Sequence, residues 1–253
     1  MWHTAPFLLY MAKTRNIPRS FTATHQTKFK NLLVSGCSYV FNNSEHHACT
    51  WPYYIRDLAC FDEVYDCSQS GAGANHVFNS ILHECLTNPD IAPDRTLIVV
   101  MWPEPTRTDV VADRAVAEKW HPMSRHDFDH SLSTLSIFNR ATGNTDMDQL
   151  CRDYKRIVGV DGQTFESGLK IVALKLTLLR LGYHSIFVPW QQDLGDISAQ
   201  ARSQFDPVVP LHNYAEVTGQ QESDGHPSPN AHLAWSRQYL LPWLKTLGVI
   251  DEV

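Results

Sequence analysis

A short apolar strand that ends in a glycine and a serine is the feature that most constrains this chain. Residues 32–42 read Leu-Leu-Val-Ser-Gly-Cys-Ser-Tyr-Val-Phe-Asn. A short apolar run that stops at a turn residue is typical of a central strand in a parallel sheet, where both faces are buried. Because ligands bind beyond the carboxyl ends of such strands, the pattern predicts that the Ser38 hydroxyl faces a substrate. An ordinary Ser-capped turn is the alternative.

A carboxylate and an imidazole occur together near the end of the chain. Residues 223–232 read Ser-Asp-Gly-His-Pro-Ser-Pro-Asn-Ala-His and precede a helix-like run that ends at residue 247. A serine becomes a good nucleophile when a base takes its proton, and an acid orients that base. Ser38, His226 and Asp224 are candidates for these roles, with a Ser38 to His226 distance of about 2.6–3.2 Å. His232 is the competing base, although its position suits a solvated or capping histidine at the start of the closing helix.

These two segments together resemble the first and last blocks of the SGNH (GDSL-like) hydrolases. In that family the nucleophile lies in a Gly-Asp-Ser turn after the first strand, and here the turn reads Gly36-Cys37-Ser38. Residues 66–75, Asp-Cys-Ser-Gln-Ser-Gly-Ala-Gly-Ala-Asn, resemble the second block, whose glycine gives its backbone N–H to the oxyanion hole. The resemblance implies this role for Gly71 or Gly73, with a flexible Gly-rich loop as the alternative.

The chain departs from the family pattern in two places. The expected third strand, residues 96–102, runs into Trp-Pro-Glu-Pro-Thr-Arg, whereas the family has a Gly-x-Asn-Asp block whose Asn is an oxyanion donor. The oxyanion would then rely on the amides of Ser38 and of Gly71 or Gly73. Asn75, Trp102 and Arg107 are the further oxyanion or substrate contacts that this comparison suggests. The acid also stands two residues before the histidine instead of three, which leaves open whether Asp224 or another acid orients the imidazole.

The combined motifs resemble a subgroup of SGNH-like proteins that is often found in tailed bacteriophages. The resemblance implies a three-layer α/β/α domain with a mostly parallel sheet and a serine esterase or deacylase that needs no cofactor or metal. O-acetylated carbohydrate is slightly favoured over lipid and small esters, because the chain has a polar insertion and the aromatic residues Trp51, Trp102 and Trp120. A homo-oligomer or a virion assembly is the protein partner that we consider.

Composition excludes several other classes of function. The chain has 253 residues and a net charge of −6, and its basic residues are scattered, so we expect neither a nucleic-acid nor a membrane partner. The apolar residues 6–12 have no preceding basic region and make a poor signal peptide, which predicts a cytoplasmic product on synthesis, in keeping with virion association. Six cysteines without a Cys-x-x-Cys pair indicate reduced thiols. Cys37 is the alternative nucleophile, but a small buried cysteine is the commoner case.

The chain is expected to form a single domain over residues 28–253 after an N-terminal extension of residues 1–27. Strands are predicted at residues 30–34, 63–67, 96–101 and 183–188, and helices at 51–59, 74–87 and 165–181. The last helix is amphipathic, with an apolar stripe of Leu169, Val172, Leu176 and Leu179 that would face the core. A polar insertion at about residues 106–161 is expected to be a lid or wall beside Ser38, or a contact surface for another subunit. Residues 190–221 are interpreted as a loop.

Two other functions remain open at this point. His126 and His130 would lie one helical turn apart, and His46, His47 and Cys49 add further ligand types, which together would suit a metal-dependent hydrolase. The glutamate of the metalloprotease motif is absent, and 13 histidines make chance pairs common. The other hypothesis is a non-catalytic binding or structural protein on the same fold, because fold does not determine function.

Overall fold

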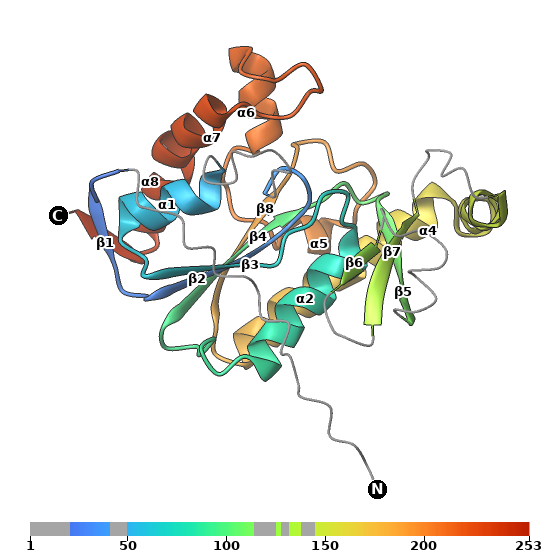
Figure 1. The fold of residues 1–253 in the computed structure, drawn as a ribbon, viewed down its shortest axis with the longest axis horizontal. Helices are drawn as coiled ribbons and strands as arrows, with labels where there is room; N and C mark the ends of the chain where they lie inside the picture. The colour runs from blue at the N-terminus through green and yellow to red at the C-terminus, as the bar shows by residue number, and fades with distance from the viewer. Residues whose placement is uncertain (1–20, 41–49, 114–124, 128–131, 138–144, 253) are drawn as a thin grey trace, which may run out of the picture.

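A central parallel sheet of four strands organises the molecule. The structure is a computed structural model, and it describes residues 21–40, 50–113, 125–127, 132–137 and 145–252. The strands run in the order β3 (Glu63–Asp66), β2 (Asn31–Ser35), β4 (Thr96–Trp102) and β8 (His184–Pro189), and every neighbouring pair is parallel (Figure 1). These are the four strands that the sequence predicts, with ends shifted by at most one residue.

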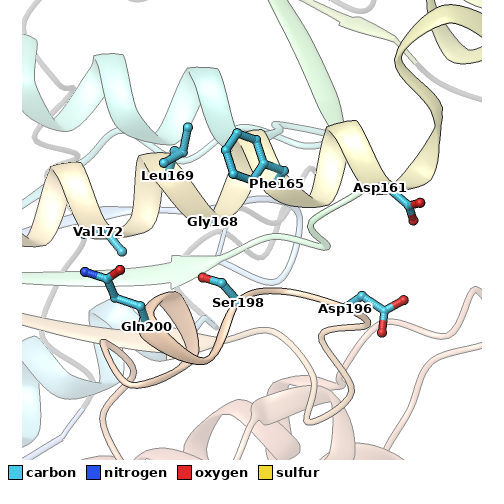
Figure 2. A pocket seen from close by; sticks show the side chains of 8 residues that line it. All are labelled: Asp161, Phe165, Gly168, Leu169, Val172, Asp196, Ser198 and Gln200. Atoms are coloured by element: carbon cyan, nitrogen blue, oxygen red, sulfur yellow. The ribbon is translucent and has the colours of Figure 1, made fainter.

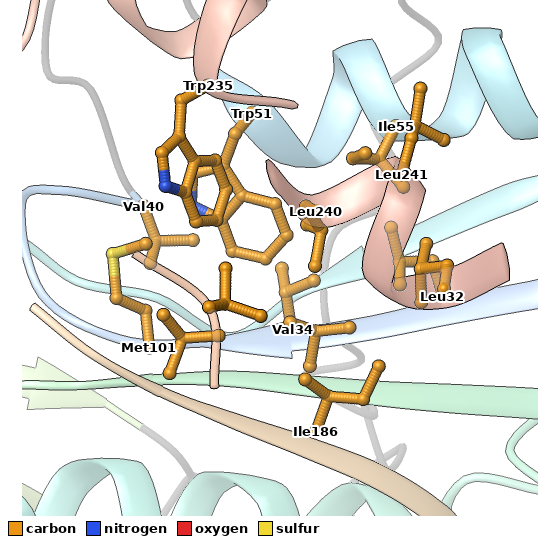
Figure 3. Close-up of a cluster of buried hydrophobic side chains, with 14 of the residues drawn as sticks. Leu32, Val34, Val40, Trp51, Ile55, Met101, Ile186, Trp235, Leu240 and Leu241 are labelled. Carbon is orange, nitrogen blue, oxygen red and sulfur yellow. The ribbon is translucent and has the colours of Figure 1, made fainter. Parts of the chain in front are cut away.

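Helices cover both faces of this sheet. One face carries α1 (Trp51–Ala59), α6 (Leu211–Thr218), α7 (Pro229–Trp235), the π-helix η2 (Ser236–Leu240) and α8 (Leu241–Thr246). The other carries α2 (Ala74–Thr87), α4 (Thr145–Arg180) and the short α5 (Ala199–Arg202). The side chains of β2 alternate between the two cores, with Leu32 and Val34 in the first and Leu33 in the second (Figure 3). The predicted three-layer α/β/α architecture is confirmed.

The order of the strands places a topological switch point at the end of β2. The chain leaves β2 through α1 to reach β3 on one side, and then returns through α2 on the opposite face to reach β4 on the other side. Such a reversal separates the loops beyond the carboxyl ends of the strands and is where open α/β sheets bind ligands. The turn that contains Ser38 directly follows β2, and it therefore lies at this switch point.

Two small sheets complete the fold. The strand β1 (His25–Thr27) pairs antiparallel with β9 (Ile250–Glu252), so the folded domain begins before residue 28, inside the predicted extension. The polar insertion contains β5 (Thr108–Asp113), β6 (Arg125–Asp127) and β7 (Leu132–Ile137), which form an antiparallel sheet in the order β5-β7-β6. Strand β5 contacts α2 (Figure 1). The last part of the insertion forms the first turns of α4.

Two expectations about the second half of the chain are wrong. Residues 190–221 contain the helices α5 and α6, although their polar composition suggested a loop. In α4 the residues buried against the sheet are Ile171, Leu174 and Leu178, whereas Leu169, Leu176 and Leu179 of the predicted core stripe are exposed and only its Val172 packs partly against this core. The reason is that α4 has apolar residues on two faces, and helical periodicity alone does not show which face meets the sheet. No helix within the described residues is long and apolar enough to cross a membrane.

Candidate active site

The turn after β2 exposes one side chain and buries its neighbour. A Cβ atom at Gly36 would lie 2.4 Å from Val40 Cγ2 and 2.8 Å from the Met101 carbonyl oxygen, so only glycine fits where the chain leaves the strand. The Val40 N–H donates to the Cys37 carbonyl at 2.9 Å and closes the turn. Cys37 is fully buried in the core, whereas Ser38 is partly exposed. This burial removes Cys37 from the candidate nucleophiles.

His226 lies beside Ser38 although 188 residues separate them in the chain. Its Nε2 atom is 2.8 Å from Ser38 Oγ, within the distance that the sequence analysis predicts. The loop that carries the imidazole is closed by the Glu222 N–H, which donates to the His226 carbonyl at 2.7 Å, and Gly225 supplies a left-handed residue with φ of 83°. The loop leads directly into α7, as the last-block resemblance implies.

Asp224 is the carboxylate that contacts this imidazole. Its Oδ1 accepts the His226 backbone N–H at 3.0 Å, and its Oδ2 lies 3.1 Å from His226 Nδ1, although without the in-line geometry of a hydrogen bond. The backbone N–H is the main reason why the pKa of Asp224 is lowered, and the imidazole adds to the effect. The carboxylate side chain is 63% exposed, so water competes with the imidazole for it.

A cluster of three aromatic rings adjoins the imidazole through Tyr39, and sequence reasoning missed all three. The ring of Tyr39 lies 5.3 Å from that of His226, and the rings of Trp190 and His212 lie 4.9 Å apart. The Tyr39 hydroxyl is 3.0 Å from His212 Nδ1. Burial raises the pKa of Tyr39 to about 12 and lowers the pKa of His212, so both are neutral near pH 7. Because Trp190 directly follows β8, the rule that ligands bind beyond strand ends could have identified it.

Arg107 borders this aromatic group. Its Cζ atom lies 5.8 Å from the centre of the Trp190 ring, and its Nε lies 3.8 Å from a Glu104 carboxylate oxygen. The guanidinium is also close enough to Tyr39 to oppose part of the rise in the pKa of that hydroxyl. Arg107 therefore lies beside Trp190 and near Tyr39, and its contact with a substrate stays a prediction. It also marks the point at which the polar insertion meets the site.

Two of the predicted oxyanion donors are engaged elsewhere. The N–H groups of Gly73 and His76 donate to Asp109 Oδ2 at 2.9 and 3.0 Å, and the Asn75 N–H donates to Oδ1 at 2.8 Å. The Asn75 side-chain amide donates to the Asp109 carbonyl oxygen. These bonds tie the N-terminus of α2 to β5. They exclude the Gly73 N–H as an oxyanion donor in this conformation, whereas the Asn75 side-chain amide has a second hydrogen beyond the one it donates to Asp109.

Of the two glycines that the second block suggests, Gly71 is the remaining candidate. It follows β3 and has a φ of 81°, a conformation that glycine adopts without strain. The Asp109 side chain that displaces Gly73 from this role is fully buried, and burial raises its pKa to about 6 despite the three N–H donors. Asp109 stands outside every motif in the sequence, and no local pattern signals its position.

Two tryptophans and a histidine that the sequence suggested for the site belong to the core. The Trp102 side chain is fully buried, and its indole N–H donates to Ser167 Oγ at 2.9 Å, so it contacts α4 and not a substrate. Trp51 is also fully buried and packs against Trp235 at 5.9 Å, while Trp120 lies outside the described residues. The buried His232 accepts the Trp51 N–H at 3.3 Å.

His232 therefore caps the first turn of α1 and does not compete as the base. A capping histidine was expected at the start of the closing helix, whereas His232 accepts a backbone N–H from the first turn of α1. Burial lowers the pKa of His232 to about 3, which keeps the imidazole neutral at physiological pH.

The described part of the chain gives no structural support to the hypothesis of a metal-dependent hydrolase. Among those residues there is no group of three or more His, Cys, Asp or Glu side chains that could hold a metal ion. His126 lies in the strand β6, so the helical-turn spacing assumed for it and His130 does not apply at that position. His130, His46, His47 and Cys49 lie outside the described residues.

Comparisons with known proteins find the fold but no similar sequence. A scan of family models and a search of curated proteins gave no match to this chain. Among solved structures, TesA matches with a TM-score of 0.51 at 12% identity, over 86% of this chain and 99% of its own. The psychrotrophic esterase EstA from Pseudoalteromonas sp., in a structure inhibited by monoethylphosphonate, has a TM-score of 0.45 at 8% identity, over 85% and 99% of the two chains.

A third solved structure is a lipolytic protein of the G-D-S-L family from Desulfitobacterium hafniense DCB-2. It has a TM-score of 0.36 at 9% identity, and the match covers 82% of this chain and 96% of that one. At such low identities the likeness to TesA shows a shared fold, and it leaves the chemistry to be argued from the residues of this chain.

Proposed function

We propose that this chain is an ester hydrolase in which Ser38 attacks the acyl carbonyl. The observation that carries the proposal is the 2.8 Å separation of Ser38 Oγ and His226 Nε2 at the switch point of the sheet. A hydroxyl and an imidazole at hydrogen-bond distance, with a carboxylate on the other ring nitrogen, form the arrangement that activates a serine. Because fold alone does not determine function, this constellation and not the overall likeness supports the assignment.

The reaction follows from the positions of these three groups. The Ser38 proton passes to His226 Nε2 as Oγ bonds to the substrate carbonyl carbon, and the carbonyl oxygen takes the negative charge. The imidazolium then gives that proton to the leaving alcohol oxygen as the ester bond breaks, which leaves an acyl-serine. A water molecule repeats the sequence, giving its proton to Nε2 and releasing the carboxylic acid and free Ser38. Asp224 stabilises the imidazolium in both halves.

The developing oxyanion needs donors that are already in place. We assign this role to the backbone amide of Ser38 and, following the second-block resemblance, to that of Gly71, which follows β3 with a φ of 81°. With the family's third-block Asn replaced in this chain, two donors would serve where the family uses three. Loss of one such donor typically lowers the rate by about a hundred- to a thousandfold. We therefore expect slower turnover than a full oxyanion hole would give.

The side chains that border His226 favour a sugar ester as substrate. The half-buried rings of Trp190 and His212, which pack on the buried Tyr39, give flat apolar surfaces, and the Arg107 guanidinium adds hydrogen-bond donors beside Trp190. Aromatic faces with a polar edge suit carbohydrate rings better than long acyl chains, which need an extended apolar channel. The substrate class is accordingly an O-acetylated carbohydrate. The contributing tryptophan is Trp190 and not the buried Trp51 or Trp102.

A second candidate is a catalytically inactive binding or structural protein on this fold. The specific observation in its favour is that the Gly73 and Asn75 donors are engaged by Asp109, while the third block lacks its Asn. The motif resemblance to the tailed-bacteriophage subgroup points the same way, toward association with a virion.

Steady-state kinetics separates the two candidates. The purified chain should hydrolyse aryl acetates and acetylated sugars, and Ser38→Ala should lower kcat/KM by about a thousandfold or more while unfolding free energy changes by less than about 1 kcal/mol. Ser203→Ala, an exposed serine remote from His226 in the sequence, is the matched control and should leave the rate unchanged.

His226→Ala should match Ser38→Ala, and the double variant should be little worse, because the two residues act as one unit. A chelator should have no effect on the rate. Turnover that survives Ser38→Ala but disappears with chelator would support the metal-dependent alternative. No turnover on either substrate class would support the inactive candidate.

A further inference from the structure

Helix α4 carries apolar side chains on two faces, and within the described residues only the inner face is buried, with Val172 of the outer face packing partly against the same core. The inner face packs Ile171, Leu174 and Leu178 against the sheet. The outer face carries a row that we call the outer stripe, namely Phe165, Leu169, Val172, Leu176 and Leu179. The exposed fractions of Phe165, Leu169, Leu176 and Leu179 are 67%, 55%, 54% and 70%. A helix that is apolar all round is normally buried on all sides, so this face calls for a partner.

The spacing of the outer stripe specifies what kind of partner fits. Its members follow one another at steps of four, three, four and three residues, which is the pattern of a coiled-coil seam. The row is also centred on Val172, with Phe165 seven residues before it and Leu179 seven residues after it. A second copy of α4 that runs antiparallel about a twofold axis at Val172 would place Phe165 against Leu179 of the second copy. The stripe is therefore complementary to itself, as a twofold interface requires.

A groove beside the first half of the stripe supports this orientation. Its volume is about 320 Å³, and Phe165, Leu169 and Val172 line it from α4, with Ser198 and Gln200 opposite (Figure 2). Asp161 and Asp196 lie together at one end of the groove (Figure 2).

The charges on α4 complement one another in the same antiparallel arrangement. The other end of the stripe carries the exposed Arg180, one residue beyond Leu179. Antiparallel pairing about Val172 brings Arg180 of each copy level with residue 164 of the other copy. Arg180 then lies next to the end of the other copy's groove that carries Asp161 and Asp196. Parallel pairing would place Arg180 beside Arg180, which is unfavourable.

We propose that this chain forms a twofold homodimer by antiparallel packing of α4 through the outer stripe. Exposed aliphatic and aromatic side chains offer about 100 Å² each, so the four most exposed members contribute about 400 Å² per copy. The stripe residues of two copies together would bury about 800 Å², which is below the size of a standard specific interface, so we expect a weak, reversible dimer. The proposal does not depend on catalysis, because no member of the stripe contacts Ser38, His226 or Asp224 among the interactions described above.

Sedimentation equilibrium of the full chain tests the proposal. The unaltered chain should be mostly dimeric at about 100 μM and mostly monomeric at about 0.1 μM. Leu176→Glu should weaken association at least tenfold, and Arg180→Glu should weaken it by a smaller factor that shrinks at high salt. Val217→Glu on α6 is the matched control, because Val217 is also apolar and is more exposed than Leu176 but lies off the stripe, and it should associate like the unaltered chain.

A monomer at about 200 μM, or equal association of Leu176→Glu and Val217→Glu, would overturn the proposal and indicate a different occupant for the stripe. Far-ultraviolet circular dichroism should show that each variant is folded, which is expected because the altered side chains lie outside the core.

Cysteine cross-linking tests the orientation independently. Val172→Cys lies at the proposed twofold axis, so mild oxidation should yield a disulfide-linked dimer that the unaltered chain does not form. Leu179→Cys should not cross-link, because an antiparallel pair separates the two copies of residue 179 by about 20 Å along the helix. Cross-linking of Leu179→Cys but not of Val172→Cys would refute the antiparallel arrangement.

Discussion

The buried carboxylate of Asp109 allows a sharp test of how the second block is held. It accepts the N–H groups of Gly73, Asn75 and His76 and thereby joins β5 to the start of α2. Burial disfavours the ionised form more than these donors favour it, so the pKa of Asp109 rises from 3.8 to about 6. Asp109→Asn keeps the size of the side chain but removes the titration, and its effect on stability should therefore depend on pH.

The direction and the size of this pH dependence of stability follow from the raised pKa of Asp109. The unfolded chain releases the Asp109 proton near pH 3.8, whereas the folded chain keeps it up to about pH 6. Over that interval the folded state binds more protons, so the contribution of Asp109 to stability falls as pH rises and levels off above about pH 6. A shift of two units corresponds to about 3 kcal/mol in total, of which about 1 kcal/mol is lost between pH 5 and pH 7.

Urea unfolding at pH 5 and at pH 7 measures this difference. The free energy of unfolding of the unaltered chain, minus that of Asp109→Asn, should be about 1 kcal/mol more favourable at pH 5 than at pH 7. Asp62→Asn controls for the loss of an exposed carboxylate. A difference that is the same at both pH values, or that grows as pH rises, would refute the account of a buried carboxylate with a raised pKa.

Three further outcomes follow from the same structure. Because burial holds the pKa of His232 near 3, only the unfolded chain takes up a proton on this imidazole as pH falls below about 6.5. The unaltered chain should therefore lose about 2 kcal/mol of unfolding free energy between pH 7 and pH 5, and urea unfolding should show that His232→Phe removes this loss. Asp224→Asn should lower kcat by about ten- to a hundredfold, far less than Ser38→Ala, because the carboxylate is exposed to water; a loss as large as that of Ser38→Ala would contradict this reasoning. Gly73→Ala should lower the free energy of unfolding by about 1–3 kcal/mol, because the new Cβ would lie 2.5 Å from the Arg107 carbonyl oxygen. Gly168→Ala is the comparison in thermal unfolding and should be neutral or stabilising, because its Cβ would lie 3.4 Å from the nearest atom.

Elements with strong local signals could be predicted from the sequence. The helices at residues 51–59 and 74–87 have the predicted ends, and the four parallel strands lie where apolar runs stop at turn residues. The Ser38 and His226 segments are also local, since a few residues of characteristic type fix each of them. Their pairing across 188 residues followed from family resemblance, and no periodicity in the sequence contains it.

Features that depend on tertiary contacts could not be predicted in the same way. Asp109 binds the start of α2 across 33 to 36 residues, and nothing near it in the sequence indicates a buried carboxylate. The side of α4 that meets the sheet was undetermined, because both of its faces are apolar. Trp102 is different, since strand alternation places it on the same face as Ile98 and Val100, and that pattern would have assigned it to the core.

The central claim is that Ser38 is an activated nucleophile. A fluorophosphonate probe reacts with serines whose proton is removed by a neighbouring base, and peptide mapping identifies the residue that carries the adduct. The account predicts one adduct on the peptide that contains Ser38, loss of that adduct in Ser38→Ala, and much slower labelling in His226→Ala. An unlabelled chain, or labelling that persists at another residue in Ser38→Ala, would contradict it.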